Sequence, residues 1–432
     1  MEERKSHEKE KITSSSERRR RRSEETVSQS RSKMRRDEYY DGISRRRREL
    51  GTDDEILNHD VLEQVMLRLP VKSLLRFQTV SKHWRRMITS MSFKERHMLH
   101  QKTQEPKLVR FFYSYRSYRR SYYMKYAYKT MRLEWSSACL VEEEEEEGYF
   151  ISDDKGRPTR DDSGVISSSI DGLVCFYAFT REITVMNPAT KWSYKLPLPN
   201  IQIDYDDSES KIPSPGFGKD YVTGTYKIVW LHSISNYDTT LSCEIFDFGV
   251  KQWRLVTPPL PEHRLNHDNL PTFANGWLYW FHLDATKLIA FDLHMEMFQV
   301  IPNPIIETSS SSVVDMDLGS IGDDRRLVWA LETNGDGMQH VWRLTNHNTG
   351  GALLKMDKMF SIDLNKINPT YMPPDISRLF HPSAISKNGN KVMLFEQFQD
   401  PLLFEPLNST YHILSCSSFR LVPVSLFLFF QV

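Results

Sequence analysis

The sequence predicts an α+β multidomain protein, in which a small domain of three helices precedes a larger domain made of β-strands. Two observations lead to this prediction. Between Asp53 and Leu99, apolar residues recur at intervals of three and four, as they do along amphipathic helices. From Ser163 onward, short apolar runs and turn residues recur in the same order, as they do in stacked β-hairpins. At 432 residues the chain is long enough for two or three domains.

The first predicted helix begins near Asn58, a residue that can cap it. It ends at Pro70, because proline lacks a backbone donor and disfavours helical geometry in the residue before it. Its apolar residues have a spacing that places them along one side: Val61, Leu62, Val65, Met66 and Leu69.

Two further helices are predicted directly after Pro70, and Ser81 can cap the second of them. Their apolar residues are Leu74, Leu75 and Phe77 in one helix, and Trp84, Met87 and Ile88 in the other. Three helices within about forty residues bury too little apolar surface to form a stable hydrophobic core of their own. The pattern therefore favours a docking module, and the alternative is that the helices only pack on their own chain.

The run RLPVKSLLRF at Arg68–Phe77, followed by VSKHW at Val80–Trp84, resembles the F-box of plant F-box proteins. The resemblance implies that these helices bind the Skp-type adaptor of a cullin-RING ubiquitin ligase. The adaptor-binding residues that it implies are Leu57, Asn58, Leu62, Leu69, Pro70, Leu74, Leu75, Val80, Ser81 and Trp84. Family members usually open with Leu-Pro where this chain has Leu57-Asn58, so an apolar contact is lost and we expect somewhat weaker docking.

Residues 1–50 contain 17 Lys and Arg against 11 Asp and Glu, and almost no aliphatic residues. Such a segment cannot bury enough apolar surface to offset its ordering entropy, so we expect a disordered basic leader. Its two clusters of arginine, Arg18–Arg22 and Arg45–Arg48, are typical of a nuclear import signal or of an arm that binds phosphate groups. The alternative, which we favour, is that these arginines are solvated and have no binding role.

The four cysteines lie far apart and form no CxxC pair, which fits neither a disulfide framework nor a zinc site and favours a reducing compartment. The N-terminus lacks the apolar stretch of a secretory signal. The apolar run Leu421–Phe430 is about half the length of a membrane-spanning helix. We therefore expect a protein of the nucleus, the cytoplasm or both, without a membrane segment.

The stretch Lys107–Arg132 is dense in tyrosine and basic residues. Bases interleaved with aromatics can stack on single-stranded nucleic acid. The same alternation is also typical of β-strands that expose one face to solvent. The acidic run Glu142–Glu147 would compete with the phosphate groups of a nucleic acid for the basic side chains. We predict first strands followed by an acidic loop, and nucleic-acid binding remains the less favoured alternative.

The repeated pattern is clearest where Asp171-Gly172 precedes Leu173–Tyr177, and where Asn275-Gly276 precedes Trp277–Phe281. Further predicted strands are Ile183–Asn187, Tyr226–Leu231, Cys243–Phe248, Leu288–Leu293, Val392–Phe395 and Leu402–Glu405. Another hairpin is predicted at Arg326–Leu331 and Val341–Leu344, with an irregular segment after it up to Phe360 and Leu364. A polar or acidic residue precedes an aromatic residue by five or six positions in four places: Asn187 and Trp192, Asp247 and Trp253, Asp292 and Phe298, and Glu405 and Tyr411. Single hairpins cannot bury their faces alone, so repeats of this length predict the blades of a kelch-like β-propeller.

The segments DGLVCFYAFTREITVMNPATKWSYKLPLP, GFGKDYVTGTYKIVW, CEIFDFGVKQWRLV, NGWLYWF and LIAFDL resemble the F-box-associated domain of plant F-box proteins. The implied organisation is a leader at 1–50, a trihelical F-box at 53–99, an all-β propeller at 106–420, and an apolar tail at 421–432 that can supply a closing strand. In the family this second domain recruits the protein to be ubiquitinated, so the resemblance implies a substrate-recognition subunit of an SCF-type (Skp-cullin-F-box) ligase. It does not specify the target-binding residues or the number of blades.

No motif predicts catalytic, cofactor-binding or metal-binding residues. Gly216-Phe217-Gly218 lacks the later glycine of a nucleotide loop, and we predict a turn there before the strand at Tyr226. His263 and His267 have a spacing that suits a metal on a helix, but the surrounding prolines favour a loop. We therefore expect a subunit without enzymatic activity, with a nucleic-acid-binding protein and a scaffold that degrades nothing as the alternatives.

Overall fold

The computed structural model describes residues 59–104, 107–118, 121–142, 148–151, 165–167, 169–177, 182–199, 215–233, 241–256, 265–266, 269–308, 313–321, 327–334, 337–345, 355–367, 379–386, 388–395, 401–414 and 426–430. The chain divides into two compact units, Met1–Leu69 and Pro70–Val432. Several predictions fall outside the described residues: the leader at 1–50, the cap at Asn58, the acidic loop at 143–147, and His263 and His267.

In the first unit, helix α2 (His59–Leu67) occupies the predicted position and ends before Pro70, as predicted. Asp60 lies in its first turn, where a carboxylate interacts favourably with the helix dipole. Met66 is buried, whereas Val61 and Val65 are each 51% exposed. The apolar residues of α2 are therefore divided between a buried and an exposed group, although their spacing alone places them on one side.

The second unit begins with helices α3 (Val71–Phe77), α4 (Lys82–Thr89) and α5 (Met91–Lys102). The predicted cap at Ser81 is confirmed, because its hydroxyl accepts a hydrogen bond from the Trp84 amide. Ser90 caps α5 in the same way through the Phe93 amide. Helix α5 is an addition to the three predicted helices, and its apolar spacing is weak because the position four residues after Phe93 is the polar but buried His97.

The rest of the second unit is all-β, and its described strands form six sheets. The first sheet has the order β25-β1-β2-β3, with β4 also paired to β2, and consists of β1 (Lys107–Tyr118), β2 (Ser121–Glu134), β3 (Cys139–Glu142), β4 (Gly148–Ile151) and β25 (Leu426–Phe430).

The second and third sheets are β5 (Val165–Ile166), β6 (Val174–Tyr177), β7 (Ile183–Asn187) and β8 (Trp192–Lys195), then β9 (Gly216–Lys219), β10 (Tyr226–Ser233), β11 (Leu241–Asp247) and β12 (Gln252–Leu255). The fourth and fifth are β13 (Thr272–Ala274), β14 (Trp277–Phe281), β15 (Lys287–Asp292) and β16 (Phe298–Pro302), then β17 (Val313–Ile321), β18 (Leu327–Asn334), β19 (Met338–Thr345) and β20 (Lys355–Asp363). The sixth is β21 (His381–Ile385), β22 (Val392–Phe395), β23 (Leu402–Glu405) and β24 (Thr410–Ile413). A short helix, α6 (Pro304–Thr308), and a 3-10 turn, η2 (Leu364–Lys366), follow β16 and β20.

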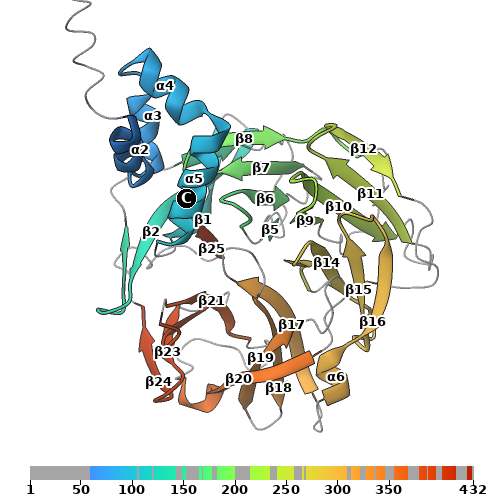
Figure 1. The fold of residues 1–432 in the computed structure, drawn as a ribbon. Coiled ribbons are helices and arrows are strands. Elements are labelled where there is room, and N and C mark those ends of the chain that lie inside the picture. The colour runs from blue at the N-terminus through green and yellow to red at the C-terminus, as the bar shows by residue number, and fades with distance from the viewer. Residues whose placement is uncertain are drawn as a thin grey trace, which may run out of the picture. The chain divides into compact units, whose positions relative to one another are not determined.

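The sheets are arranged around a common centre as the blades of a propeller, which confirms the predicted fold class (Figure 1). The inner strands β9 and β13, β13 and β17, β17 and β21, and β21 and β25 contact one another in turn. The first sheet obtains its inner strand from the far end of the chain, because β25 pairs antiparallel with β1 over Lys107–Phe111. Neighbouring blades are therefore joined through their inner strands, and the two ends of the β-domain meet in one sheet.

The predicted hairpins correspond mainly to the second and third strands of each blade, and the first strands were not predicted. The turn predicted at Gly216-Phe217-Gly218 is wrong: these residues lie in strand β9, which pairs with β10. A Cβ atom at Gly218 would collide with the side chains of Leu293 and Phe273 in the next blade. The glycine is thus required by close packing between blades. The hairpin predicted at Arg326–Leu331 and Val341–Leu344 corresponds to β18 and β19. The segment after it, expected to be irregular, contains strand β20, which pairs with β19 with one bulge after Val341.

A recurrent turn explains the polar residues that precede the aromatic ones. The side chains of Asn187, Asp247 and Asp292 each accept a hydrogen bond from the amide two residues later. A non-glycine residue with positive φ then reverses the chain four residues after the polar one, at Lys191 and Lys251 among others. These Asx turns connect the third and fourth strands of successive blades.

The aromatic residue that follows each turn packs against its own or the preceding blade. Trp253 on β12 donates its indole N–H to the Pro197 carbonyl at 2.7 Å. Pro197 lies just after β8, the last strand of the preceding blade. The Tyr411 hydroxyl accepts a hydrogen bond from the Asp363 amide at the end of β20. Trp253 and Tyr411 therefore each connect their blade to the preceding one, and Trp253 does so through the proline.

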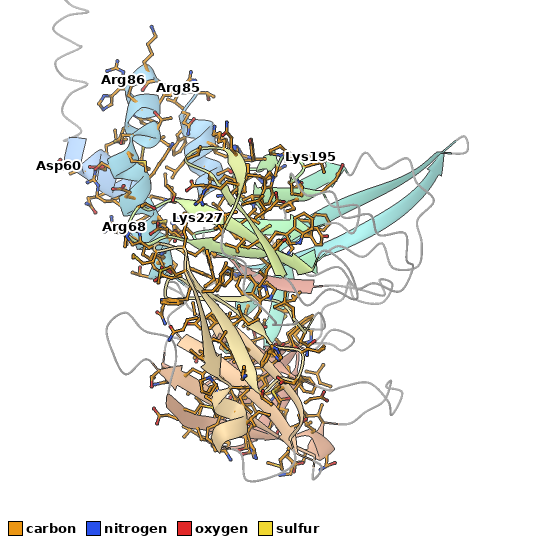
Figure 2. All side chains as sticks on the ribbon, turned by 90° about the vertical axis from the view of Figure 1, so that its right-hand side faces the viewer. Asp60, Arg68, Arg85, Arg86, Lys195 and Lys227 are labelled. Carbon is orange, nitrogen blue, oxygen red and sulfur yellow. The ribbon has the colours of Figure 1, made fainter. Side chains whose placement is uncertain are left out.

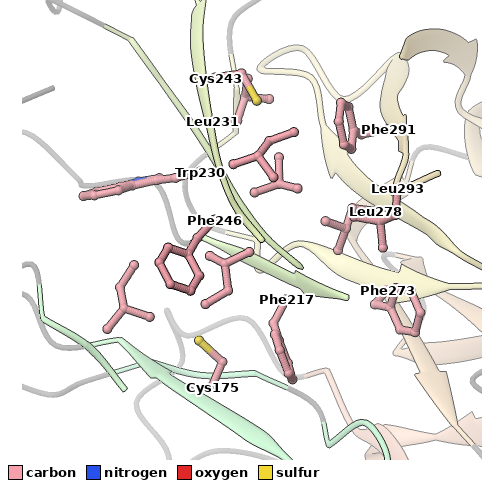
Figure 3. Close-up of a cluster of buried hydrophobic side chains, with 14 of the residues drawn as sticks. Cys175, Phe217, Trp230, Leu231, Cys243, Phe246, Phe273, Leu278, Phe291 and Leu293 are labelled. Carbon is pink, nitrogen blue, oxygen red and sulfur yellow. The ribbon is translucent and has the colours of Figure 1, made fainter. Parts of the chain in front are cut away.

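The largest buried cluster lies between the second, third and fourth sheets (Figure 3). Phe217 on β9 and Leu278 and Phe291 in the next blade belong to it, and so does Cys175 on β6. Phe246 is fully buried and contacts Phe248 and Trp253 edge-on. This cluster joins three adjacent blades, and three further clusters of buried residues lie among the other sheets.

Candidate functional site

The predicted docking residues on α3 and α4 have unequal exposure. Leu74 is buried, whereas the neighbouring Leu75 is 40% exposed and Val80 is 61% exposed. Trp84 is half-buried and packs edge-on against Phe77, with ring centroids 5.3 Å apart. Leu74 and Trp84 therefore hold the helices together, and Leu75 and Val80 are available to a partner.

The other predicted residues are placed as follows. Pro70 is exposed at the start of the second unit, and Ser81 is occupied as the cap of α4. Leu62 and Leu69 in the first unit are half-buried. Leu57 lies outside the described residues. No described contact assigns any of these residues to a partner, so their role in binding stays a prediction.

The helices α3 to α5 carry a strong positive charge that our motif-based reasoning did not identify. Residues 70–104 contain eight Lys and Arg and the single acid Glu95: Lys72, Arg76, Lys82, Arg85, Arg86, Lys94, Arg96 and Lys102. Arg85 and Arg86 are exposed on α4 (Figure 2). A surface of this sign attracts acidic partners and accelerates their association. A charge count over this segment would have found it.

The end of α5 is attached to the propeller through a buried carboxylate. Asp171, in the turn between β5 and β6, pairs with Lys102 of α5 at 2.9 Å and with Lys219 of β9 at 2.6 Å. The Tyr226 hydroxyl donates a third hydrogen bond to it at 2.8 Å. Burial opposes ionisation of Asp171, but the two lysines outweigh it and lower the pKa of this carboxyl. The helices and the second blade are thus joined by charge-assisted hydrogen bonds.

A second polar cluster joins the third and fourth blades. The Lys227 ammonium is 5% exposed and contacts the Leu293 carbonyl at 2.6 Å, Glu296 at 2.8 Å and Asp220 at 3.5 Å. Glu296 also pairs with Arg254. Burial of the fully buried Asp220 favours its neutral form, but hydrogen bonds from Thr223, Val222 and His294 lower its pKa to about 2. Within the described residues these charges satisfy one another, which is typical of a structural network.

The described residues show little that suggests chemistry. They contain no group of three side chains able to hold a metal ion. Cys175 and Cys243 are buried, and burial raises the pKa of the Cys175 thiol to about 12, which makes it unreactive near neutral pH. No described helix has both the length and the apolar character needed to cross a bilayer.

Residues 55–96 match the family described as the F-box domain, and residues 124–317 match the family described as the F-box associated beta propeller domain. The chain belongs to the F-box protein family.

Three similar proteins of Arabidopsis thaliana carry that name. F-box protein At5g10340 is 32% identical over 322 residues, covering 67% of this chain and 68% of its own. For F-box protein At1g11270 the identity is 32% over 310 residues, covering 65% and 88%. For F-box protein At2g34280 it is 30% over 349 residues, covering 72% and 82%.

The two matched regions of this F-box protein agree with its secondary structure. The F-box match spans helices α2, α3 and α4 and ends within α5. The propeller match begins in β2 and ends in β17, so it covers the second, third and fourth sheets fully. The later blades and the closing strand β25 extend the same architecture beyond the matched residues.

Proposed function

We propose that this F-box protein is the substrate receptor of an SCF-type ubiquitin ligase. In this role the F-box helices bind a Skp-type adaptor, and the propeller binds a protein that is to be ubiquitinated. Membership of the family and the combination of F-box and propeller support the proposal.

The observation that carries the proposal is the exposed pair Leu75 and Val80 on helices whose charge is strongly positive. Single exposed side chains of this kind are common on protein surfaces, so the support comes from their position within the matched F-box and from the charge around them. Burying both in an interface removes apolar surface from water, which contributes about 25 cal/mol per Å². The basic residues around them favour an acidic adaptor surface.

The proposed receptor contributes proximity and performs no bond chemistry itself. Ubiquitin transfer takes place elsewhere in the ligase, and the receptor raises the effective concentration of target lysines near the charged carrier. Attachment of α5 to the propeller through Lys102 and Asp171 suits this role, because a firm connection limits the positions that a bound target can occupy.

The test is capture of a purified Skp-type adaptor by the full chain. We expect Leu75→Glu with Val80→Glu to reduce capture at least about tenfold, because each carboxylate would be buried without a partner. The matched control is Val222→Glu with Val250→Glu, two exposed valines in propeller turns, which should leave capture unchanged. Equal capture by the helix variant and the control would refute the assignment.

A scaffold that binds the adaptor and a partner without degrading anything remains the alternative. It differs from a receptor in one measurable respect. Partners isolated by proximity labelling should have longer half-lives in cells that carry the helix variant if the protein is a receptor, and unchanged half-lives if it is a scaffold.

A further inference from the structure

Strands β1 and β2 extend beyond their neighbours in the first sheet. β25 covers β1 only over Lys107–Phe111, and β4 covers β2 only over Lys125–Tyr128. From Phe112 to Tyr118, β1 pairs only with β2 among the described strands. We call these residues, with their partners Ser121–Ala127, the arm. It projects past the other strands (Figure 2) and continues about 20 Å beyond the end of β25 at the usual rise per residue.

The outer edge of the arm continues the line along which β25 already pairs with β1. Alternate residues of Phe112–Tyr118 direct backbone N–H and C=O groups toward this edge, and the described strands leave them without a β-partner. A two-stranded ribbon is only marginally stable in water, and a third strand would stabilise it. The edge therefore offers a template for an extended segment of another chain.

The β1–β2 hairpin that carries the arm is strongly basic, and Arg116 and Lys125 lie within the arm itself. Residues 107–133 contain eight Lys and Arg and no Asp or Glu: Lys107, Arg110, Arg116, Arg119, Arg120, Lys125, Lys129 and Arg132. Arg116 pairs with Tyr123, and Ser114 pairs with Lys125, so Arg116 and Lys125 fall on one face of the ribbon. Tyr113 and Tyr115 fall on the other face. By the same register Tyr123 shares the face of the two cations, so a strand added at this edge would have cations and aromatic residues on one side and tyrosines on the other.

We propose that the edge of Phe112–Tyr118 binds an extended acidic segment of the target protein by strand addition. The inference rests on the proposed function and names the kind of target. Positive charge alone would suit a nucleic acid equally well. The open backbone edge favours a peptide, because it offers main-chain donors and acceptors at the spacing of a β-strand, which a nucleic acid cannot match. Acidic residues in the segment complement Arg116 and Lys125.

A fluorescently labelled peptide of alternating Val and Glu, long enough to span the edge, tests the proposal by anisotropy with the full chain. Three other probes accompany it: the same peptide with Lys for Glu, one with Pro for Val, and an oligothymidine. We expect the Glu peptide to bind, the Lys peptide to fail, and the Pro peptide to bind at least about tenfold more weakly, since each proline removes a ladder donor.

The matching protein variant is Arg116→Glu with Lys125→Glu. We expect it to lose at least about tenfold in affinity for the Glu peptide through like-charge repulsion. The control, Lys251→Glu with Lys287→Glu, makes the same charge change at two exposed propeller lysines and should bind normally. If the arm variant does not fold, the comparison of the four probes on the unaltered chain still decides the question.

Three results would overturn the proposal. Equal binding of the Pro and Val peptides would exclude strand addition. Tighter binding of the oligothymidine, with displacement of the peptide, would assign the arm to nucleic acid. Absence of peptide binding, together with self-association of the arm variant, would show that the cations only protect an open edge. Adaptor capture by the same samples reports separately on the proposed function, because the arm takes no part in it.

Discussion

The helices α3 to α5 and the propeller differ in how they use apolar side chains. The propeller buries a large apolar core, in which Ile228, Leu231 and Phe246 are inaccessible to solvent, and it also leaves apolar residues such as Val222 and Leu407 exposed in its turns. The helices leave Leu75 and Val80 exposed while burying only a few residues such as Leu74. The propeller is therefore stabilised by a core of its own, whereas the helices have a small core, and the proposed function assigns their exposed Leu75 and Val80 to a partner. Four substitutions test this contrast.

The largest effect is expected inside the propeller. Phe246→Ala should lower the free energy of unfolding by about 4 kcal/mol, because it removes a fully buried ring and leaves a cavity. Urea denaturation measures the change, and Val250→Ala, in an exposed position of the next turn, should change it by less than about 0.5 kcal/mol. Below the unfolding transition, adaptor capture by both variants should equal that of the unaltered chain. A small effect of Phe246→Ala would mean that the blades do not share one core.

The next effect concerns the charges between blades. Lys227→Met should cost about 3 kcal/mol, because it leaves the carboxylate of Asp220 buried without its cation. Adding Asp220→Asn should recover part of the loss, since the amide oxygen can still accept from Val222 and Thr223. A double-mutant cycle in urea measures the coupling. Additive losses would show that the two groups act independently.

The sequence predicted the elements that local chemistry determines. Pro70 ended a helix and Ser81 capped one, and the Asx turns marked the outer hairpins. The first strands of the blades were missed whether short, as in Val165–Ile166, or long, as in Val313–Ile321, because their place is fixed by contacts with neighbouring blades. Glycine in β9 looked like a turn for the same reason, since the close contact with Leu293 comes from a distant part of the chain.

The sites show the same division between local and distant information. The sequence located the F-box helices, but it could not separate the buried Leu74 from the exposed Leu75, which depends on how the helices pack. It also gave no sign that Lys227 would meet Glu296, which lies in the next blade. Such a pair forms only when a strand of one blade and an Asx turn of the next are brought together by the propeller.

A smaller effect should link the helices to the propeller through pH. The pKa of Asp171 is lowered in the folded chain, so its pairing stabilises the fold above the ordinary carboxyl pKa of about 4 and is lost as the pH falls through the lower folded value. Hydrogen exchange of α5 amides should therefore accelerate on acidification. In Asp171→Asn the exchange should already be fast at neutral pH and should vary little with acid. Glu95→Gln, an exposed change on the same helix, should behave as the unaltered chain does.

The smallest effect is expected at the cap of α4. Ser81→Ala should destabilise the helix by about 1 kcal/mol, because the Trp84 amide loses its acceptor. Since Val80 directly precedes the cap, adaptor capture should weaken less than it does with the charged helix variant. Ser81→Asp keeps an acceptor and should restore both properties in titrations against the adaptor. Failure of Ser81→Asp to do so would assign Ser81 a direct contact with the adaptor.

The pairing of β25 with β1 has a consequence during synthesis. The ribosome synthesises the chain from its N-terminus, so the first sheet cannot be completed until residues 426–430, which form its inner strand, have been made. Until then β1 presents a bare edge to every neighbouring nascent chain. A premature stop codon in the last tenth of the coding sequence would leave the edge of β1 permanently exposed. We expect chaperones to recognise these truncated proteins even though most of their blades are intact.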